Sequence, residues 1–164
     1  MPITENSVRP IYETELDRTR EDQVFDVLSR VLNFDCIGVP KLSVVDKLLC
    51  RNGTLIAVAE FKTRTIKHDA YPTYMLSSNK HTAMLALSAS LKVPAVLIVM
   101  FSDLIVFTKL RRGYEQKSGG RTDRGDHKDV GACVFIPMQE FKTITGATSK
   151  QEVSHAVRKQ TKTV

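Results

Sequence analysis

The sequence has 164 residues, of which 42% are hydrophobic and 26% are charged, and its formal net charge is +6. These values predict one soluble globular domain spanning residues 1–164, long enough to bury a hydrophobic core. The longest apolar run, at 93–101, is too short to span a bilayer, and the N-terminus has no apolar signal-peptide core. Three cysteines without CxxC spacing argue against a disulfide framework or a zinc knuckle, so we expect a cytoplasmic protein with no membrane partner.

The chain is expected to begin with an irregular arm at 1–12, followed by a helix at about 14–32. Glu21 lies three residues before Val24 and seven before Leu28, which places its carboxylate on the apolar face of that helix. A carboxylate directed towards the core needs a reason, and Glu21 is therefore a candidate functional residue. If the helix is rotated or starts later, an acidic residue one turn earlier would take this place, either Asp17 or Glu15.

Two strands are predicted next, at about 42–50 and 54–62. Asn52-Gly53 lies between these apolar runs, and Asn-Gly in that position is a strong hairpin signal. A two-residue turn at Asn52-Gly53 puts Asp46 and Glu60 on opposite faces of the hairpin. A three-residue loop with its glycine in a bulge lets Asp46 and Glu60 share a face. Shared metal binding requires the second register, or a bulge with the same effect.

The following elements are predicted as a polar loop at 63–77, a helix at 78–91, buried strands at 95–101 and 103–108, and a strand at 132–138. Continuous apolar runs on either side of the helix indicate two parallel strands joined by a right-handed crossover. Lys80 lies on the same side of that helix as its apolar residues. It either contacts phosphate in a cleft or is an exposed lysine of the first turn.

Positive charge is concentrated in a Gly-rich segment at 109–131, predicted as a loop, and in a tail at 149–164. Between residues 109 and 128 there are seven Lys/Arg against three acids, and the tail has four Lys/Arg against one acid. Basic, flexible segments suit the phosphate backbone of nucleic acid, because that backbone rewards charge more than shape. A solubilising role is the alternative. The candidate DNA-binding arginines of the first segment are Arg111, Arg112, Arg121 and Arg124.

The tetrapeptide EFKT occurs at 60–63 and again at 140–143, and each copy has an aspartate fourteen residues before its glutamate, Asp46 and Asp126. In the first copy the glutamate and lysine point the same way at the end of an apolar strand. Two charges in that position are costly unless something pairs with them. The second copy follows Pro137, which cannot donate to a central ladder, and its aspartate lies in loop sequence. We therefore assign the candidate site to the first copy.

The order of the predicted elements resembles that of the PD-(D/E)xK nuclease superfamily. A helix with Glu21 is followed by a strand with Asp46, a strand with the sequence EFK at 60–62, a further helix and a further strand. The resemblance covers about residues 15–108, although Asp46 follows valine rather than proline. It implies an α/β fold with a central mixed β-sheet flanked by helices, in an αβββαβ restriction-endonuclease-like core. By the same resemblance Asp46, Glu60 and the Phe61 carbonyl would bind the metal. Lys62 would align the attacking water, and Glu21 would lie near the metal.

The resemblance further implies a Mg²⁺-dependent DNA endonuclease in which Mn²⁺ can substitute. The residue types agree, because Mg²⁺ prefers carboxylate and carbonyl oxygens. The small size, the basic tail and the lack of a recognition domain suggest either structure-selective cutting of branched or nicked DNA or general cutting. Junction resolution by a homodimer is one form, and nicking and recombination-linked trimming are others. Further DNA contacts are expected from Lys80 and Arg64, with Tyr71 and Tyr74 as additional candidates.

Two other interpretations stay open. One is a non-catalytic nucleic-acid-binding or assembly protein on the same fold, which the intact Asp46, Glu60 and Lys62 disfavour. The other is an unrelated α/β domain in which Glu60 and Lys62 form a structural ion pair.

Overall fold

The computed structural model describes residues 15–40, 43–120 and 130–144. The arm expected at 1–12 and the basic tail expected at 149–164 lie outside the described residues. None of the helices in the described part of the chain is long and apolar enough to cross a membrane. The elements, in chain order, are α1 Glu15–Leu32, β1 Asp35–Gly38, β2 Lys47–Arg51, β3 Thr54–Thr63, β4 Thr73–Ser77, α2 Ser78–Leu91, β5 Ala95–Met100, β6 Ile105–Lys109, β7 Glu115–Gly120, β8 Val130–Pro137, a 3-10 helix Met138–Glu140 and β9 Lys142–Thr143.

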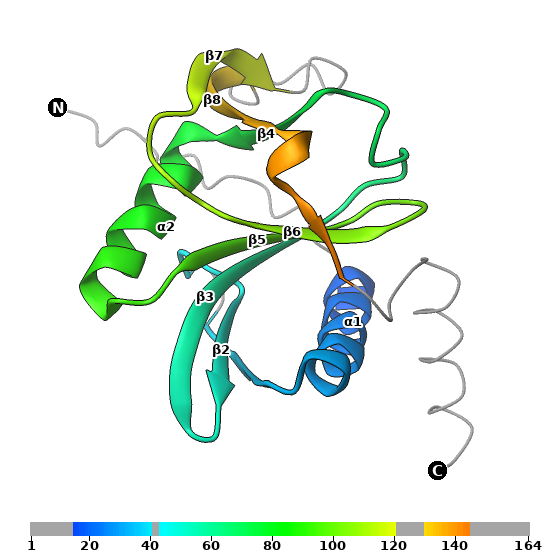
Figure 1. Cartoon of the computed structure of the whole chain (residues 1–164), viewed down its shortest axis with the longest axis vertical. Coiled ribbons are helices and arrows are strands. Elements are labelled where there is room, and N and C mark those ends of the chain that lie inside the picture. Colours follow the sequence, from blue (N-terminus) through cyan, green and yellow to red (C-terminus); the bar gives the residue numbers. More distant parts are fainter. Residues whose placement is uncertain (1–14, 41–42, 121–129, 145–164) are drawn as a thin grey trace, which may run out of the picture.

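The larger of two sheets has the strand order β1-β2-β3-β5-β6-β9. β3 and β5 are parallel and are joined through α2, as predicted, whereas the other neighbouring strands are antiparallel. The sheet is therefore mixed, and α1 and α2 lie on its two sides (Figure 1). The order α1, β1, β2, β3, α2, β5 forms the predicted αβββαβ restriction-endonuclease-like core.

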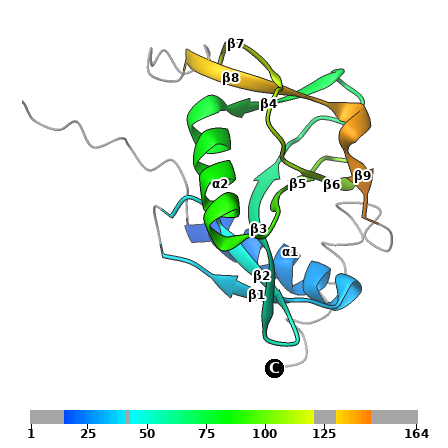
Figure 2. The same cartoon turned by 60° about the vertical axis from the view of Figure 1, so that its left-hand side comes forward.

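A smaller sheet has the order β4-β8-β7 and lies on the same side of the larger sheet as α2 (Figure 2). Its buried residues pack with Met84 of α2 and with Val58, Leu97 and Val99 of the larger sheet. The molecule thus has one hydrophobic core on each side of the larger sheet.

The sequence interpretation was wrong about three strands. The resemblance implied a third strand before α2, but none was located at 35–38, because β1 has only four residues and most of them are exposed. β4 lies in the segment predicted as a polar loop, although its buried Tyr74 and Leu76 alternate with exposed residues as expected for a strand on a sheet surface. β7 lies inside the segment 109–131 that was also predicted as a loop, and it is a strand because it pairs with β8.

The β2–β3 hairpin combines a tight turn with a bulge. Asn52 and Gly53 both have positive φ, 50° and 74°, as a two-residue type I′ turn requires. Next to the turn Cys50 pairs with Leu55, but Leu49 pairs with Ala57, so one extra residue enters β3. Further along, Lys47 pairs with Ala59, and continuing this register brings Asp46 opposite Glu60. The turn therefore has the two residues of the first alternative, and the bulge has the effect on Asp46 and Glu60 that shared metal binding requires.

The two faces of β3 have different environments. Phe61 faces α1, where its ring lies 5.3 Å from the Phe25 ring and belongs to a core with Val24 and Leu28. Glu60 points to the other side, because successive side chains of a strand alternate. Its parallel partner Leu97 belongs to the core beneath α2. The β3 strand therefore carries its glutamate and lysine on the side covered by α2 and the smaller sheet.

Candidate active site

Asp46 and Glu60 are brought together by the bulged hairpin. Asp46 lies just before β2, where its backbone N–H donates to the Ala59 carbonyl at 3.0 Å. Its carboxylate Oδ2 accepts a hydrogen bond of 2.8 Å from the Phe61 N–H. Glu60 is fully buried in β3. The backbone of β3 therefore holds Asp46 in place beside Glu60.

Two lysines approach the Glu60 carboxylate from different elements. Lys62 Nζ of β3 lies 2.7 Å from Oε1, and Lys80 Nζ of α2 lies 2.8 Å from Oε2. Lys80 also donates a 2.9 Å hydrogen bond to the Val44 carbonyl, two residues before Asp46. Lys80 is thus part of the cluster, and not a solvated lysine of the first helical turn.

Burial and charge shift the pKa values of this cluster. Burial raises the pKa of Glu60 above its usual range, Lys62 opposes that shift, and the nearby Asp46 carboxylate adds to it. Burial alone would lower the pKa of Lys62, but attraction to Glu60 and Asp46 outweighs burial and raises it. Lys62 is therefore held in its protonated form next to a carboxylate that water does not reach.

The Glu60 carboxylate is also a suitable cation ligand. Its two oxygens lie at ion-pair distance from the ammonium groups of Lys62 and Lys80. A buried carboxylate is stable in its charged form only next to positive charge, whether from ammonium groups or from a metal ion. Together with Asp46 on the same face, Glu60 offers the hard oxygen ligands that Mg²⁺ prefers. The residues present fit a magnesium ion.

Tyr74 of β4, in the smaller sheet, lies close to Lys62 and Glu60. The sequence analysis identified it only as a possible DNA contact. Burial raises the pKa of its hydroxyl, while the nearby Arg64 and Lys62 oppose that rise. The Arg64 guanidinium lies 5.1 Å from the centre of the Tyr74 ring. In the sequence the apolar Met75 separates Tyr74 from Leu76, so period-two alternation does not mark this strand, and its pairing with β8 places Tyr74 here.

Glu21 lies on the helix that covers the opposite face of the sheet. Its neighbour Asp22 forms an ion pair with Lys47 of β2, and the Lys47 ammonium lies 5.6 Å from the Phe25 ring. Burial would lower the pKa of Lys47, but Asp22, and to a smaller extent Glu21, raise it. Glu21 is half-buried and close to Lys47. Glu21 therefore lies near the residue that follows Asp46, on the α1 side of the sheet (Figure 1).

The second EFKT copy has a different environment. Glu140 accepts hydrogen bonds from Arg111, whose Nη2 lies 2.5 Å from Oε1, and from the Tyr114 hydroxyl at 3.2 Å. The Arg111 guanidinium also lies 4.4 Å from the Tyr114 ring. Arg112 is exposed. The remaining charged candidates around this copy lie outside the described residues: Arg121, Arg124 and Asp126.

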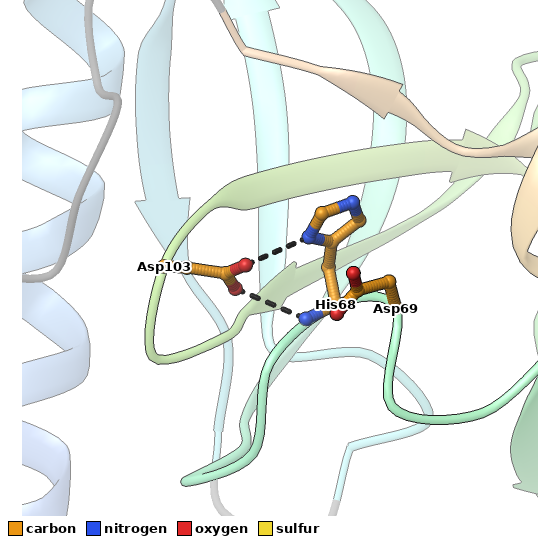
Figure 3. A group of neighbouring side chains, drawn as sticks. All are labelled: His68, Asp69 and Asp103. Atoms are coloured by element: carbon orange, nitrogen blue, oxygen red, sulfur yellow. Dashed lines mark hydrogen bonds and ion pairs between the residues drawn. The ribbon is translucent and has the colours of Figure 1, made fainter.

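A separate group of possible ligands comprises His68, Asp69 and Asp103, whose ligand atoms lie within 4.8 Å of one another (Figure 3). The Asp103 carboxylate accepts a hydrogen bond from the His68 N–H at 3.0 Å, and its other oxygen lies 2.8 Å from His68 Nδ1. Both oxygens of Asp103 are thus already engaged. This pair connects the β3–β4 loop to the β5–β6 turn (Figure 3).

The mixed sheet with helices on its two sides is the arrangement expected of the PD-(D/E)xK nuclease class, and Asp46, Glu60 and Lys62 lie together on one side of it. A model of the family described as "Phage putative PDDEXK endonuclease" matches residues 7–144 of the chain. The match spans most of the sequence, and the chain belongs to this family.

Other comparisons add little to the family match. No curated protein has a sequence that matches this chain. Among solved structures, the chain is similar to Hjc of Archaeoglobus fulgidus, a Holliday junction resolvase from an archaeal hyperthermophile. The TM-score is 0.49 and the sequence identity 14%, over 84% of this chain and 96% of that chain.

Proposed function

We propose that this protein is a Mg²⁺-dependent DNA endonuclease whose active site consists of Asp46, Glu60 and Lys62. The observation that carries the proposal is the bulge in β3, which puts the two carboxylates on one face next to the half-buried side chain of Lys62. A structural ion pair alone would not need the second carboxylate, which Phe61 holds in place by a backbone hydrogen bond. Mn²⁺ is expected to substitute for Mg²⁺.

In this proposal Asp46, Glu60 and the Phe61 carbonyl hold the metal ion. When bound, the ion polarises the phosphate and lowers the pKa of the attacking water. Lys62 Nζ, fixed beside Glu60, orients that water and offsets the negative charge that develops on the phosphorus oxygens. Lys80 Nζ lies on the other oxygen of Glu60 and provides a second positive charge for the phosphate. Burial of Glu60 excludes bulk water, which strengthens these interactions.

The substrate is proposed to be DNA of branched or nicked structure. The enzyme is proposed to act as a homodimer, in which each protomer is a single domain spanning residues 1–164. The net charge of +6 supports a polyanionic substrate. Arg64, Arg112, Arg121 and Arg124 are proposed to contact phosphates. Arg111 is proposed as a further phosphate contact, although its guanidinium already forms an ion pair with Glu140.

The test is incubation of plasmid, linear and branched DNA with the purified protein in Mg²⁺, with Asp46→Ala as the control. We expect cleavage in Mg²⁺ or Mn²⁺ and none in EDTA. Ca²⁺ should support binding with little cleavage, because its loose coordination positions water poorly. Equal cleavage by Asp46→Ala, or full activity in EDTA, would contradict the metal mechanism. Cleavage of all three DNA forms at the same rate would contradict the proposed structure selectivity, but not the proposed nuclease function.

The proposed phosphate contacts have a separate test in the salt dependence of binding. Neutralising Arg112, Arg121 and Arg124 should weaken DNA binding and flatten the slope of log K against log salt by roughly 0.9 per lost contact. Arg30→Ala, which removes an exposed arginine of α1, is the matched control. An unchanged slope in the triple variant would mean that these arginines do not contact phosphate.

A further inference from the structure

A cavity of about 350 Å³ lies between the segment that follows β3 and the smaller sheet. This volume is within the range of small-ligand pockets. Its lining is mostly apolar and includes Tyr71, Tyr74, Met75 and Phe135, with the cationic Arg64 and Lys67 also in the wall. Tyr71 is 64% exposed, which is unusual for a large aromatic side chain. An apolar, aromatic cavity with cations in its wall suits a ligand that combines apolar faces with negative charge.

The cavity is next to the candidate active site. Tyr74 lines the cavity, and its hydroxyl is close enough to Lys62 and Glu60 for their charges to affect its pKa. Arg64 follows Lys62 by two residues and places its guanidinium over the Tyr74 ring. A DNA strand that contacts Lys62 would therefore also lie close to the cavity.

The walls of the cavity are held in position. Asp103 binds both the backbone and the ring of His68 (Figure 3). The Ser102 N–H donates to the Ile66 carbonyl at 3.0 Å, and the Met138 N–H donates to the Pro72 carbonyl at 2.9 Å. The segment is thus tied to the β5–β6 turn on one side and to the smaller sheet on the other. A cavity held in this way binds its ligand without a large cost of ordering the wall.

We propose that this cavity receives one unpaired nucleobase of the DNA substrate. A base has two apolar faces, which stack on aromatic rings, and it is attached to phosphates, which bind cations. Tyr71 provides the exposed ring, while Arg64 and Lys67 contact the adjoining phosphates. A fully paired duplex keeps its bases stacked and cannot fill the cavity without the cost of unstacking. The cavity thus selects DNA with an unpaired base near the cut, and this rests on the proposed nuclease function for the cut itself.

The experiment compares two DNA duplexes that share one strand containing 2-aminopurine. In one duplex the complementary strand pairs with every base, and in the other it leaves only the 2-aminopurine unpaired. Affinities are measured by fluorescence anisotropy in EDTA, so that binding is recorded without cleavage. Wild type should prefer the duplex with the unpaired base, and its 2-aminopurine fluorescence should change on binding. Tyr71→Ala should lower that preference roughly tenfold, the scale of one base–aromatic stacking contact. Tyr71→Phe should retain it.

Leu91→Ala is the matched control, because Leu91 is an exposed apolar residue at the end of α2 and does not line the cavity. It should bind both duplexes as wild type does. Equal affinity of wild type for the two duplexes, or an unchanged preference in Tyr71→Ala, would overturn the base pocket. Cleavage in Mg²⁺ is scored separately. A protein that fails to cleave but shows the Tyr71-dependent preference would contradict the nuclease proposal and support the pocket.

Discussion

The two EFKT copies have the same four residues and opposite environments. At 60–63 the copy ends β3, which lies between β2 and β5, and its glutamate is fully buried. At 140–143 the copy crosses from a 3-10 helix into the two-residue strand β9 at the edge of the sheet. Its glutamate binds Arg111 and Tyr114 and contacts no second carboxylate among the described residues.

This comparison shows that the four residues EFKT do not by themselves determine which charged groups surround them. The first copy gains a second carboxylate because β2 pairs with β3 through a bulge, and it gains a second lysine because α2 packs over the same face. In the second copy the glutamate holds the β6–β7 connection through Arg111. The neighbouring elements, and not the motif, therefore decide that the first copy has the pair of carboxylates proposed to bind the metal.

Mutation of the matching positions tests the comparison most strongly. Glu60→Gln and Lys62→Ala should each lower the rate of DNA cleavage by about 10²–10³-fold, because each removes a charge placed where the transition state develops charge. The matched variants Glu140→Gln and Lys142→Ala should cleave at nearly the wild-type rate. Single-turnover cleavage in Mg²⁺ is the measurement. A loss of similar size at both copies would show that their environments do not separate their roles.

Metal binding should separate the copies without any measurement of activity. A ligand that binds only the folded state at 100 times its Kd stabilises it by about 2.7 kcal/mol, which corresponds to roughly 5–10 °C in Tm for a chain of this size. Saturating Mg²⁺ should therefore raise the Tm of wild type and of Glu140→Gln. Asp46→Ala and Glu60→Gln should lose this increase. The same increase in all four proteins would place the ion elsewhere, and His68, Asp69 and Asp103 would be tested next.

The Glu21→Gln variant tests whether the site around the first EFKT copy includes a residue of α1. Because α1 covers the opposite face of the sheet, Glu21 is expected to act indirectly, and Glu21→Gln should lower cleavage by about tenfold at most. The Mg²⁺ concentration needed for half-maximal cleavage should rise. Asp26→Asn, an exposed carboxylate on the same helix, is the control. A loss as large as that of Asp46→Ala would mean that Glu21 reaches the metal directly.

The smallest effect is expected at the second copy and concerns stability. Hydrogen bonding to Arg111 lowers the pKa of Glu140 below its usual 4.5. A carboxylate with a lowered pKa in the folded state stabilises the protein above its unfolded pKa, and this contribution is lost as pH falls through the folded pKa. Glu140→Gln should therefore lower Tm by roughly 1–3 °C at pH 7, as expected for a partly exposed pair, and by less below pH 4. Thermal denaturation across this pH range is the measurement, and a difference that grows in acid would contradict the assignment.

Much of the fold follows from local sequence. The apolar runs of β3 and β5 predict buried strands, and the helical spacing between them predicts α2 and the parallel crossover. β1 and β4 could not be predicted with the same security, since short strands become strands only through pairing with β2 and β8. Pairing partners distant in sequence leave almost no local signal.

The candidate site divides in the same way. Period-two alternation by itself puts Glu60 and Lys62 on one face of β3, and Asn52-Gly53 by itself predicts the turn. The extra residue in β3 depends on how β2 and β3 pack against their neighbours, and only the tertiary structure decided that Asp46 faces Glu60. The ion pair between Lys80 and Glu60 likewise requires α2 to fold back over the sheet. The sequence determined which charged residues end a buried strand, whereas tertiary packing decided which other charges meet them, because the contacts that place charges together join residues far apart in the chain.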